Sequence, residues 1–285
     1  MSTDWPRPEQ PWRTIATVAR RELRDALHSR WFALDTIAFA MLGLAVSYVS
    51  GTGTGEGLSG FGRTSAGLVN VVTLIVPLIA LTAGAGSIAA ERERGMLPFL
   101  LSQPLRRWEL LIGKWLGLVL ALATSILLGF GGCALMVAWK GGTAQGASVL
   151  LVLAGLSVLL AAGLLGVGMG ISVVSRRTGV ATGVAVFTWL LLAFATDLGL
   201  MASTLTWRLT IQSIFIVCLA NPLQVFKLWS LHATGIPLDV LGPVGQYAVD
   251  HHSASLPWLS LGSLAAWAVI PVVSASVLLS RRAAA

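Results

Sequence analysis

Long apolar runs alternate with short charged segments along this chain. The clearest run, residues 66–90, contains no charged residue. At about 1.5 Å per residue, a helix of this length exceeds a hydrocarbon core of about 30 Å. Runs of more than about 18 uncharged residues are typical of spanning helices, whereas helices of soluble domains alternate apolar and polar faces. The pattern therefore predicts helices that cross a lipid bilayer.

Six windows meet this description. The first contains Asp35, and a carboxylate at the centre of a bilayer costs about 2.5–3.5 kcal/mol on insertion scales. Because Asp35 lies near the start of its window, we expect a smaller cost there. The fifth window also contains an acidic residue, Asp197. The windows are 31–50, 66–90, 115–137, 148–174, 179–200 and 257–280.

Composition supports the same class of protein. Of the 285 residues, 55% are hydrophobic and 11% are charged, which excludes an ordinary soluble domain. We therefore predict an all-α membrane protein with six transmembrane helices.

Basic residues divide the loops into two groups. Fifteen of the 19 Lys and Arg lie in residues 1–30, 91–114 and 175–179 and at the C-terminus. Since short cytoplasmic loops collect Lys and Arg, six spans with both termini in the cytoplasm fit this alternation. The net charge of +7 then reflects topology and attraction to anionic lipids, and gives no reason to expect nucleic acid as a partner. The other four basic residues are Arg63, Lys140, Arg208 and Lys227.

The segment before the first window has a different pattern. Residues 1–30 lack the apolar core of a secretory signal, so we expect the first span to act as the anchor. The stretch WRTIATVARRELRDALHSRW predicts an amphipathic helix in the membrane interface. The alternative is a solvated leader that only supplies positive charge. The residues at helical spacing are Trp12, Ile15, Val18, Ala19, Glu22 and Ala26.

A dense group of charges lies between the second and third windows. The sequence ERERG, residues 91–95, is followed by the apolar stretch MLPFLLS and then by basic residues. A short, partly apolar helix between charged clusters suits a groove on another protein. The alternative is that these charges only flank the membrane. The chain has no GxxxxGK[ST] phosphate loop and no His/Glu metal motif, so energy or chemistry would come from a partner.

The order E-x-E-x-G, LLSxP, then Arg and a Gly-Lys pair entering a span resembles the ABC-2 type permease family. The start ARRELRDALHSRW, the Asp late in the fifth window and the stretch ANPLQVFKLWSL are similar to members that serve nitrous oxide reductase maturation. The resemblance implies one permease domain over 1–285, in the bacterial inner membrane. In it, 1–30 is the interfacial helix, 31–200 holds five spans, 201–256 is an outer loop and 257–285 is the last span with its tail.

The resemblance also implies the partners. A homodimer of this chain would work with a separate ATPase subunit that carries ATP and Mg, so that the chain itself would hold no cofactor and be no enzyme. A periplasmic partner would receive copper- or sulfur-related cargo, or conformational work, for the copper site of the reductase.

In that family the loop between the second and third spans carries the coupling helix that docks on the ATPase. We expect that a bulky residue at Gly95, or lysines at Glu91 and Glu93, would uncouple ATP hydrolysis from output. Pro98 departs from a smooth helix but is tolerated in a first turn. The family pattern falls on Glu91, Glu93, Gly95, Pro104, Arg106 and Lys114, with the apolar residues Met96, Leu97, Phe99, Leu100 and Leu101 between them.

The longest connection, 201–256, joins the fifth and sixth windows, and long connections are often functional. WRLTIQSIFIVCLA is short for a span and indicates a re-entrant or interfacial helix. Asn221 and Pro222 predict the cap and first position of a further helix, and we expect the rest of the loop to be irregular. The residues predicted to be buried in that helix are Leu223, Phe226, Leu228 and Trp229.

Polar candidates outside the charged loop are few. His251 and His252, with His232 nearby, invite a copper site, but no Cys or Met cluster accompanies them, and a plain loop is favoured. Asp197 has either a function at membrane depth or a capping role. Two alternatives to the leading function stay open. One is an ABC-2 exporter of a lipid, drug or ion, and the other is an intramembrane enzyme that uses Asp197 or Asp35 as acid or base.

Small residues recur in the fourth and fifth windows. GLLGVGMG, residues 163–170, and GVATGVAV, residues 179–186, allow close helix approach within a subunit or across a dimer. Cys133 and Cys218 have apolar neighbours in sequence and are expected to behave as small hydrophobes, not as a disulfide or a metal site.

Overall fold

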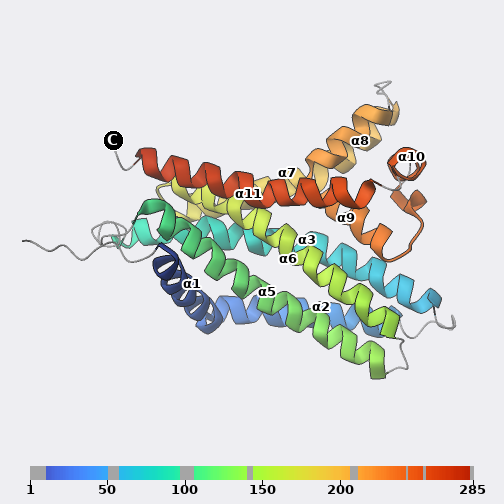
Figure 1. The fold of residues 1–285 in the computed structure, drawn as a ribbon, viewed down its shortest axis with the longest axis horizontal. Helices are drawn as coiled ribbons and strands as arrows, with labels where there is room; N and C mark the ends of the chain where they lie inside the picture. The colour runs from blue at the N-terminus through green and yellow to red at the C-terminus, as the bar shows by residue number, and fades with distance from the viewer. Residues whose placement is uncertain are drawn as a thin grey trace, which may run out of the picture.

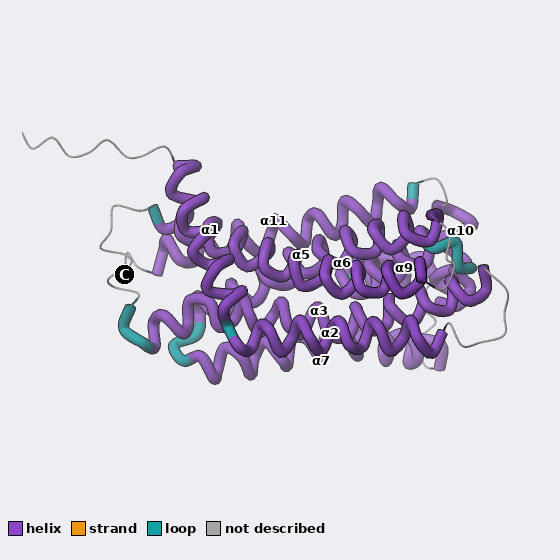
Figure 2. Tube along the Cα trace, turned by 90° about the horizontal axis from the view of Figure 1, so that it is seen from below, coloured by secondary structure: helices purple, strands orange, loops and turns teal. Residues whose placement is uncertain are grey.

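The computed structural model describes residues 11–50, 58–96, 106–139, 144–205, 211–241, 243–252 and 255–282, and nearly all of them are helical. Long helices lie side by side in an elongated bundle (Figure 1). Both views place α1 and the C-terminal end of α11 at one end of the bundle and α10 at the other (Figures 1 and 2). The end with α1 is called the junction end, after the ion pairs described below, and the opposite end is called the α10 end. The helices are α1 (Pro11–His28), α2 (Arg30–Ser50), α3 (Leu58–Glu93), α5 (Arg107–Trp139), α6 (Ala144–Val174), α7 (Thr178–Leu205), α8 (Ile211–Ala220), α9 (Pro222–Ala233), η1 (Leu238–Leu241), α10 (Pro243–His252) and α11 (Leu256–Arg282).

Each of the six predicted windows lies within one long helix, namely α2, α3, α5, α6, α7 or α11. By length and composition, α3, α5, α6 and α11 can each cross a membrane. In two further cases, a pair of consecutive helices qualifies as one bent span. These pairs are α1 with α2, bent by 68°, and α8 with α9, bent by 102°. The apolar part of α7, Thr178–Phe194, is shorter. The described residues therefore contain four to six candidate spans, and the upper count includes α8 with α9 but not α7.

The core of the bundle forms where α3 crosses α6. A Cβ added to Gly84 would lie 2.4 Å from the carbonyl oxygen of Leu165, and one added to Gly168 would lie 2.4 Å from that of Leu81. Both distances are far below van der Waals contact, so only glycine lets the two backbones touch. The 163–170 stretch is therefore used for close packing within the subunit.

A side chain of α6 also bonds directly to the α3 backbone near this crossing. Ser172 Oγ accepts hydrogen bonds from the N–H groups of Ile88 at 3.0 Å and Ala89 at 2.8 Å. The Ser172 side chain is fully buried. These bonds fix the axial position of α3 against α6, in addition to the steric fit of the glycines.

The helix predicted after Asn221 is present as α9. Asn221 accepts a hydrogen bond from the Leu223 N–H at 2.9 Å and donates one from Nδ2 to the carbonyl of Leu192 at 2.7 Å. The first bond caps α9 and the second ties the bend to α7. Of the residues predicted to be buried, Leu223, Phe226 and Leu228 are buried and Trp229 is partly buried against the core.

The segment after α9 is more ordered than expected. The prediction of an irregular connection is wrong over Pro243–His252, which forms α10. Phe215, Leu238 and Ala248 belong to a small apolar cluster shared by α8, α9, η1 and α10. This local core stabilises a helix of ten residues, although the glycines and prolines of the segment had indicated turns.

Candidate functional site

A buried group of three charges lies at the junction end. The Lys114 ammonium on α5 lies 2.7 Å from Glu91 Oε1 on α3, and it also bonds to Glu22 Oε1 on α1. The Lys114 side chain is only 3% exposed and each glutamate side chain 19%. We call Glu22, Glu91 and Lys114 the buried junction. One ammonium serves two carboxylates, and Glu91 Oε2 is buried with no hydrogen-bond partner among the described residues.

Backbone contact between α1 and α5 brings the junction together. Gly113 and Gly117 lie on either side of the lysine in the sequence GKWLG. A Cβ on Gly113 would lie 2.7 Å from Val18 Cβ, and one on Gly117 would lie 2.5 Å from the Ala19 carbonyl oxygen and 2.6 Å from Glu22 Cβ. Because the two helices touch at these glycines, Glu22 reaches the ammonium without crossing open space.

The next two residues of α3 hold the connection between α6 and α7. Arg92 Nη1 donates to the carbonyl oxygens of Val173, at 3.3 Å, and Ser175, at the end of α6. Glu93 Oε2 accepts from the backbone N–H of Thr178, the first residue of α7, at 3.0 Å. A cation at a helix C-terminus and an anion at a helix N-terminus both oppose the helix dipole and are stabilising. Consecutive side chains of α3 therefore contact α5, then α6, then α7, and the first of them is linked to α1 through Lys114.

A glycine ends α3 directly after these contacts. Gly95 has φ of +70°, and its N–H donates to the Arg92 carbonyl at 3.1 Å, while the Met96 N–H donates to the Glu91 carbonyl at 2.9 Å. This pair of bonds is a Schellman motif, which favours glycine at the left-handed position. Space does not restrict the site, since a Cβ on Gly95 would meet nothing within 4 Å.

The predicted loop residues thus divide by location. Glu91 and Lys114 lie inside the protein, while Glu93, Gly95, Met96 and Arg106 are exposed at its edge. Leu97, Pro98, Phe99, Leu100, Leu101 and Pro104 lie outside the described residues.

Sequence reasoning did not single out Glu22 or Arg92 as site residues. For Glu22 a signal was available: it is an acidic residue on the same helical face as Ile15 and Ala19, both of which are buried. A carboxylate on the buried face of a helix needs a partner.

Comparison with known proteins identifies the family. A family model described as "ABC-2 family transporter protein" matches residues 16–284. The chain belongs to the ABC-2 transporter family. It is 32% identical over 275 residues to the "Probable ABC transporter permease protein NosY" of Pseudomonas aeruginosa, covering 94% of this chain and 98% of that protein. It is 37% identical over 125 residues to the protein of the same name from Stutzerimonas stutzeri, covering 44% of this chain and 45% of that protein.

Membership of the ABC-2 family defines the general role. The chain is the membrane permease subunit of an ABC transporter, with several apolar helices, and its family implies an ATPase subunit as partner. Such a family points to transport and not to catalysis by the permease chain itself.

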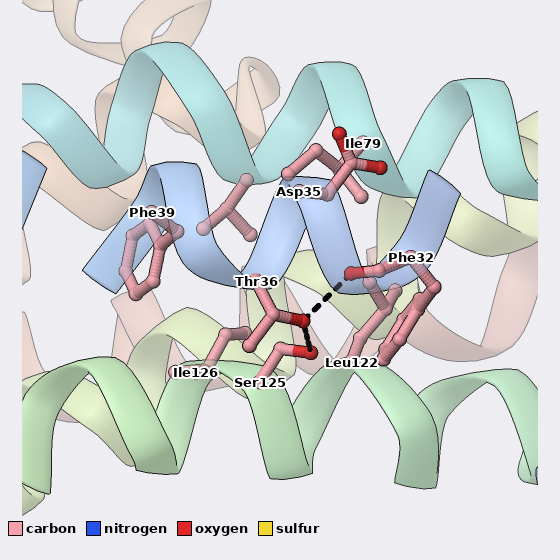
Figure 3. Close-up of a pocket in the computed structure, with 9 residues that line it drawn as sticks. Phe32, Asp35, Thr36, Phe39, Ile79, Leu122, Ser125 and Ile126 are labelled. Atoms are coloured by element: carbon pink, nitrogen blue, oxygen red, sulfur yellow. Dashed lines mark hydrogen bonds between the residues drawn. The ribbon is translucent and has the colours of Figure 1, made fainter. Parts of the chain in front are cut away.

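The permease also has a small cavity between α2, α3 and α5. Its volume is about 20 Å³, which is enough for one water-sized group and too small for a lipid or drug. Figure 3 shows the Asp35 carboxylate directed towards Ile79, while Thr36 lies on the other side of α2, with its Oγ1 2.7 Å from Ser125 Oγ. Thr36 Oγ1 also donates to the Phe32 carbonyl at 2.8 Å. Among the described residues, Asp35 is the only carboxylate that lines this cavity, whereas acid–base catalysis usually needs convergent groups.

The three candidate histidines, His232, His251 and His252, are spread over two helices. His251 on α10 stacks on Tyr247, with ring centroids 4.4 Å apart and planes 18° apart, and His232 lies exposed in the last turn of α9. The side chains of His252 and Asp197 lie outside the described set. Within the part of the chain that was searched, no three His, Cys, Asp or Glu side chains gather as a metal site would require. Cys133 and Cys218 are buried in separate apolar clusters.

Proposed function

We propose that this permease belongs to a transporter of the NosDFY type. It would couple ATP hydrolysis by a separate, NosF-like ATPase to delivery of copper- or sulfur-related cargo, or to conformational work, for the copper site of nitrous oxide reductase. The observation that carries the proposal is the likeness to NosY over nearly the whole length of both chains. The loop motif alone would fit any ABC-2 permease.

The topology proposed here has six spans, α2, α3, α5, α6, α7 and α11, with both termini and the junction end in the cytoplasm. The excess of Lys and Arg at the junction end supports this orientation. A homodimer would bind two ATPase subunits. An open face of α7 supports a helix partner there, since a Cβ on Gly179 or Gly183 would meet nothing within 4 Å.

The proposed mechanism runs from the loop to the far end of the bundle. The ATPase docks on the loop between the end of α3 and the start of α5, including the exposed Arg94 and Met96. Nucleotide binding moves this loop, and the end of α3 passes the movement to α1, α5, α6 and α7 through the contacts of Glu91, Arg92 and Glu93. A NosD-like periplasmic partner would meet the α10 end. Typical couplings between sites of about 1–3 kcal/mol are enough to bias two packed states.

A pull-down tests this function. The tagged permease is purified in mild detergent from its native host, and the proteins that co-purify with it are identified. Reversing Glu91 would also break the buried junction, so the docking variant changes the exposed Arg94 and Met96 to glutamate. Arg281→Glu, an exposed charge reversal on α11 at the same end, is the matched control.

We expect both partners to co-purify with the wild type and with Arg281→Glu, and the ATPase to be lost from the docking variant. An ATPase without a periplasmic partner would favour a general ABC-2 exporter. Absence of any ATPase from the wild-type preparation would overturn the proposal.

A further inference from the structure

We infer that Glu22 is a positioning residue for energy coupling. Through the shared ammonium of Lys114, it makes α1 move as one body with the end of α3 and the start of α5, which are called here the base of the docking loop. This inference rests on the proposed function, because the loop matters only if a partner moves it. Its structural content, the tie between α1 and the loop base, can be measured without a partner.

One of the two ion pairs of the buried junction, between Glu91 and Lys114, joins the two helices at the base of the docking loop. Glu91 lies four residues before Gly95, where α3 turns away, and Lys114 lies seven residues after the start of α5. The 2.7 Å contact between them sets the separation of the two helices on which the loop stands. A displacement of residues 97–105 therefore moves the ends of α3 and α5 together, in place of spreading them apart.

The other ion pair, between Glu22 and Lys114, connects α1 to the same lysine. Two kinds of contact hold α1 against α5: the close backbone approach at Gly113 and Gly117, and the bond from Lys114 to Glu22. The first sets how closely α1 packs on α5. The second is a directional bond, and it also links α1 to α3 because the same lysine is bonded to Glu91. Glu22 is thus the residue that adds α1 to the moving unit.

The charge balance of the junction makes this role separable from folding. Loss of Lys114 would leave two partly buried carboxylates without a cation. Loss of the Glu22 charge leaves one ammonium and one carboxylate, which is the better balanced state. Glu22→Gln therefore keeps the fold and keeps Glu91 on Lys114, while it weakens the bond between Lys114 and α1, since a carboxylate binds an ammonium more strongly than an amide does.

The matched control lies on the same helix. Asp25 pairs with Arg21 at 3.7 Å, and both side chains are largely exposed. Asp25→Asn removes the same charge from α1, one turn away, without touching the junction. Exposed pairs of this kind contribute little to stability.

The first measurement is a distance distribution between spin labels at Ala16→Cys on α1 and Arg94→Cys beside the loop, both exposed sites, in the full-length permease in lipid nanodiscs. The native Cys133 and Cys218 are replaced by alanine. We expect one narrow distribution for the parent and for Asp25→Asn, and a broadened distribution for Glu22→Gln. Distance distributions of equal width in the parent and both variants would contradict the link between α1 and the base of the docking loop.

The second measurement is the ATPase rate of the unlabelled complex relative to that of the isolated ATPase. We expect the wild-type permease to change the ATPase rate about tenfold. Glu22→Gln should lose most of this change in rate, while Asp25→Asn should keep it. A broadened distance with unchanged ATPase coupling would overturn the positioning role. Failure of the wild type to bind an ATPase would overturn the proposed function, and the spin-label result would still decide whether the tie exists.

Discussion

Lys114 Nζ lies 2.7 Å from Glu91 Oε1, although a charged loop separates the two residues in sequence. Both belong to the motif that resembles the ABC-2 coupling loop, and one interpretation of that motif was an exposed docking surface. The contact shows instead that part of the motif is internal. The exposed part begins at Glu93 and continues through Arg94 to Met96.

The first prediction concerns the loss of the buried cation. Lys114→Met should destabilise the protein by up to about 3–5 kcal/mol, because it leaves two partly buried carboxylates unpaired. The loss can be measured as a fall in apparent melting temperature in detergent, followed by size-exclusion fluorescence. Adding Glu22→Gln and Glu91→Gln to Lys114→Met should recover most of it, since no buried charge then remains. A triple variant as unstable as the single one would contradict the pairing.

The second prediction uses two glycines on one helix. Gly84→Ala should lower stability by about 1–3 kcal/mol, because its Cβ would collide with backbone atoms of α6 that cannot move aside. Gly86→Ala should be tolerated, since its Cβ would meet nothing within 4 Å. Melting temperatures of the two variants provide the comparison, and equal losses would argue against the close α3–α6 crossing.

The third prediction concerns the end of α3. At Gly95 the backbone has φ of +70°, so alanine should cost about 1 kcal/mol and asparagine less. Because the side chain would point into open space, the cost comes from the backbone alone. Melting curves of Gly95→Ala and Gly95→Asn test the order. If a bulky residue at Gly95 uncouples the ATPase while Gly95→Asn does not, the left-handed turn is needed for coupling.

Hydrophobic pattern and local chemistry predicted most of the fold. The six windows fall within six helices because long uncharged runs have few alternatives to a helix in a membrane. Asn221 and Pro222 marked the start of α9 because capping is a local property. The helix α10 was missed because its stability comes from contacts with η1 and α8, which a local pattern does not contain.

The candidate site was only partly predictable. The motif located Glu91, Glu93, Gly95 and Lys114 in one loop region, but sequence spacing could not tell an exposed charge from a buried pair. Glu22 is separated from Lys114 by 92 positions, and only the packing of α1 on two glycines of α5 brings them together. Long-range ion pairs of this kind depend on tertiary structure, so a single sequence does not reveal them.

The last prediction concerns the histidines near the α10 end. Replacing His232, His251 and His252 together by glutamine should leave copper-dependent maturation of the reductase unchanged. His251 packs on Tyr247 in a stacked pair, and His232 is exposed in the last turn of a different helix, so the two do not present a shared set of ligands on the described surface. Maturation is measured as copper content and activity of the purified reductase, with Tyr247→Phe as the control for the stacked pair. If maturation is lost while the permease is present at normal levels and still binds its ATPase, these histidines carry copper and the α10 end is a metal-transfer site.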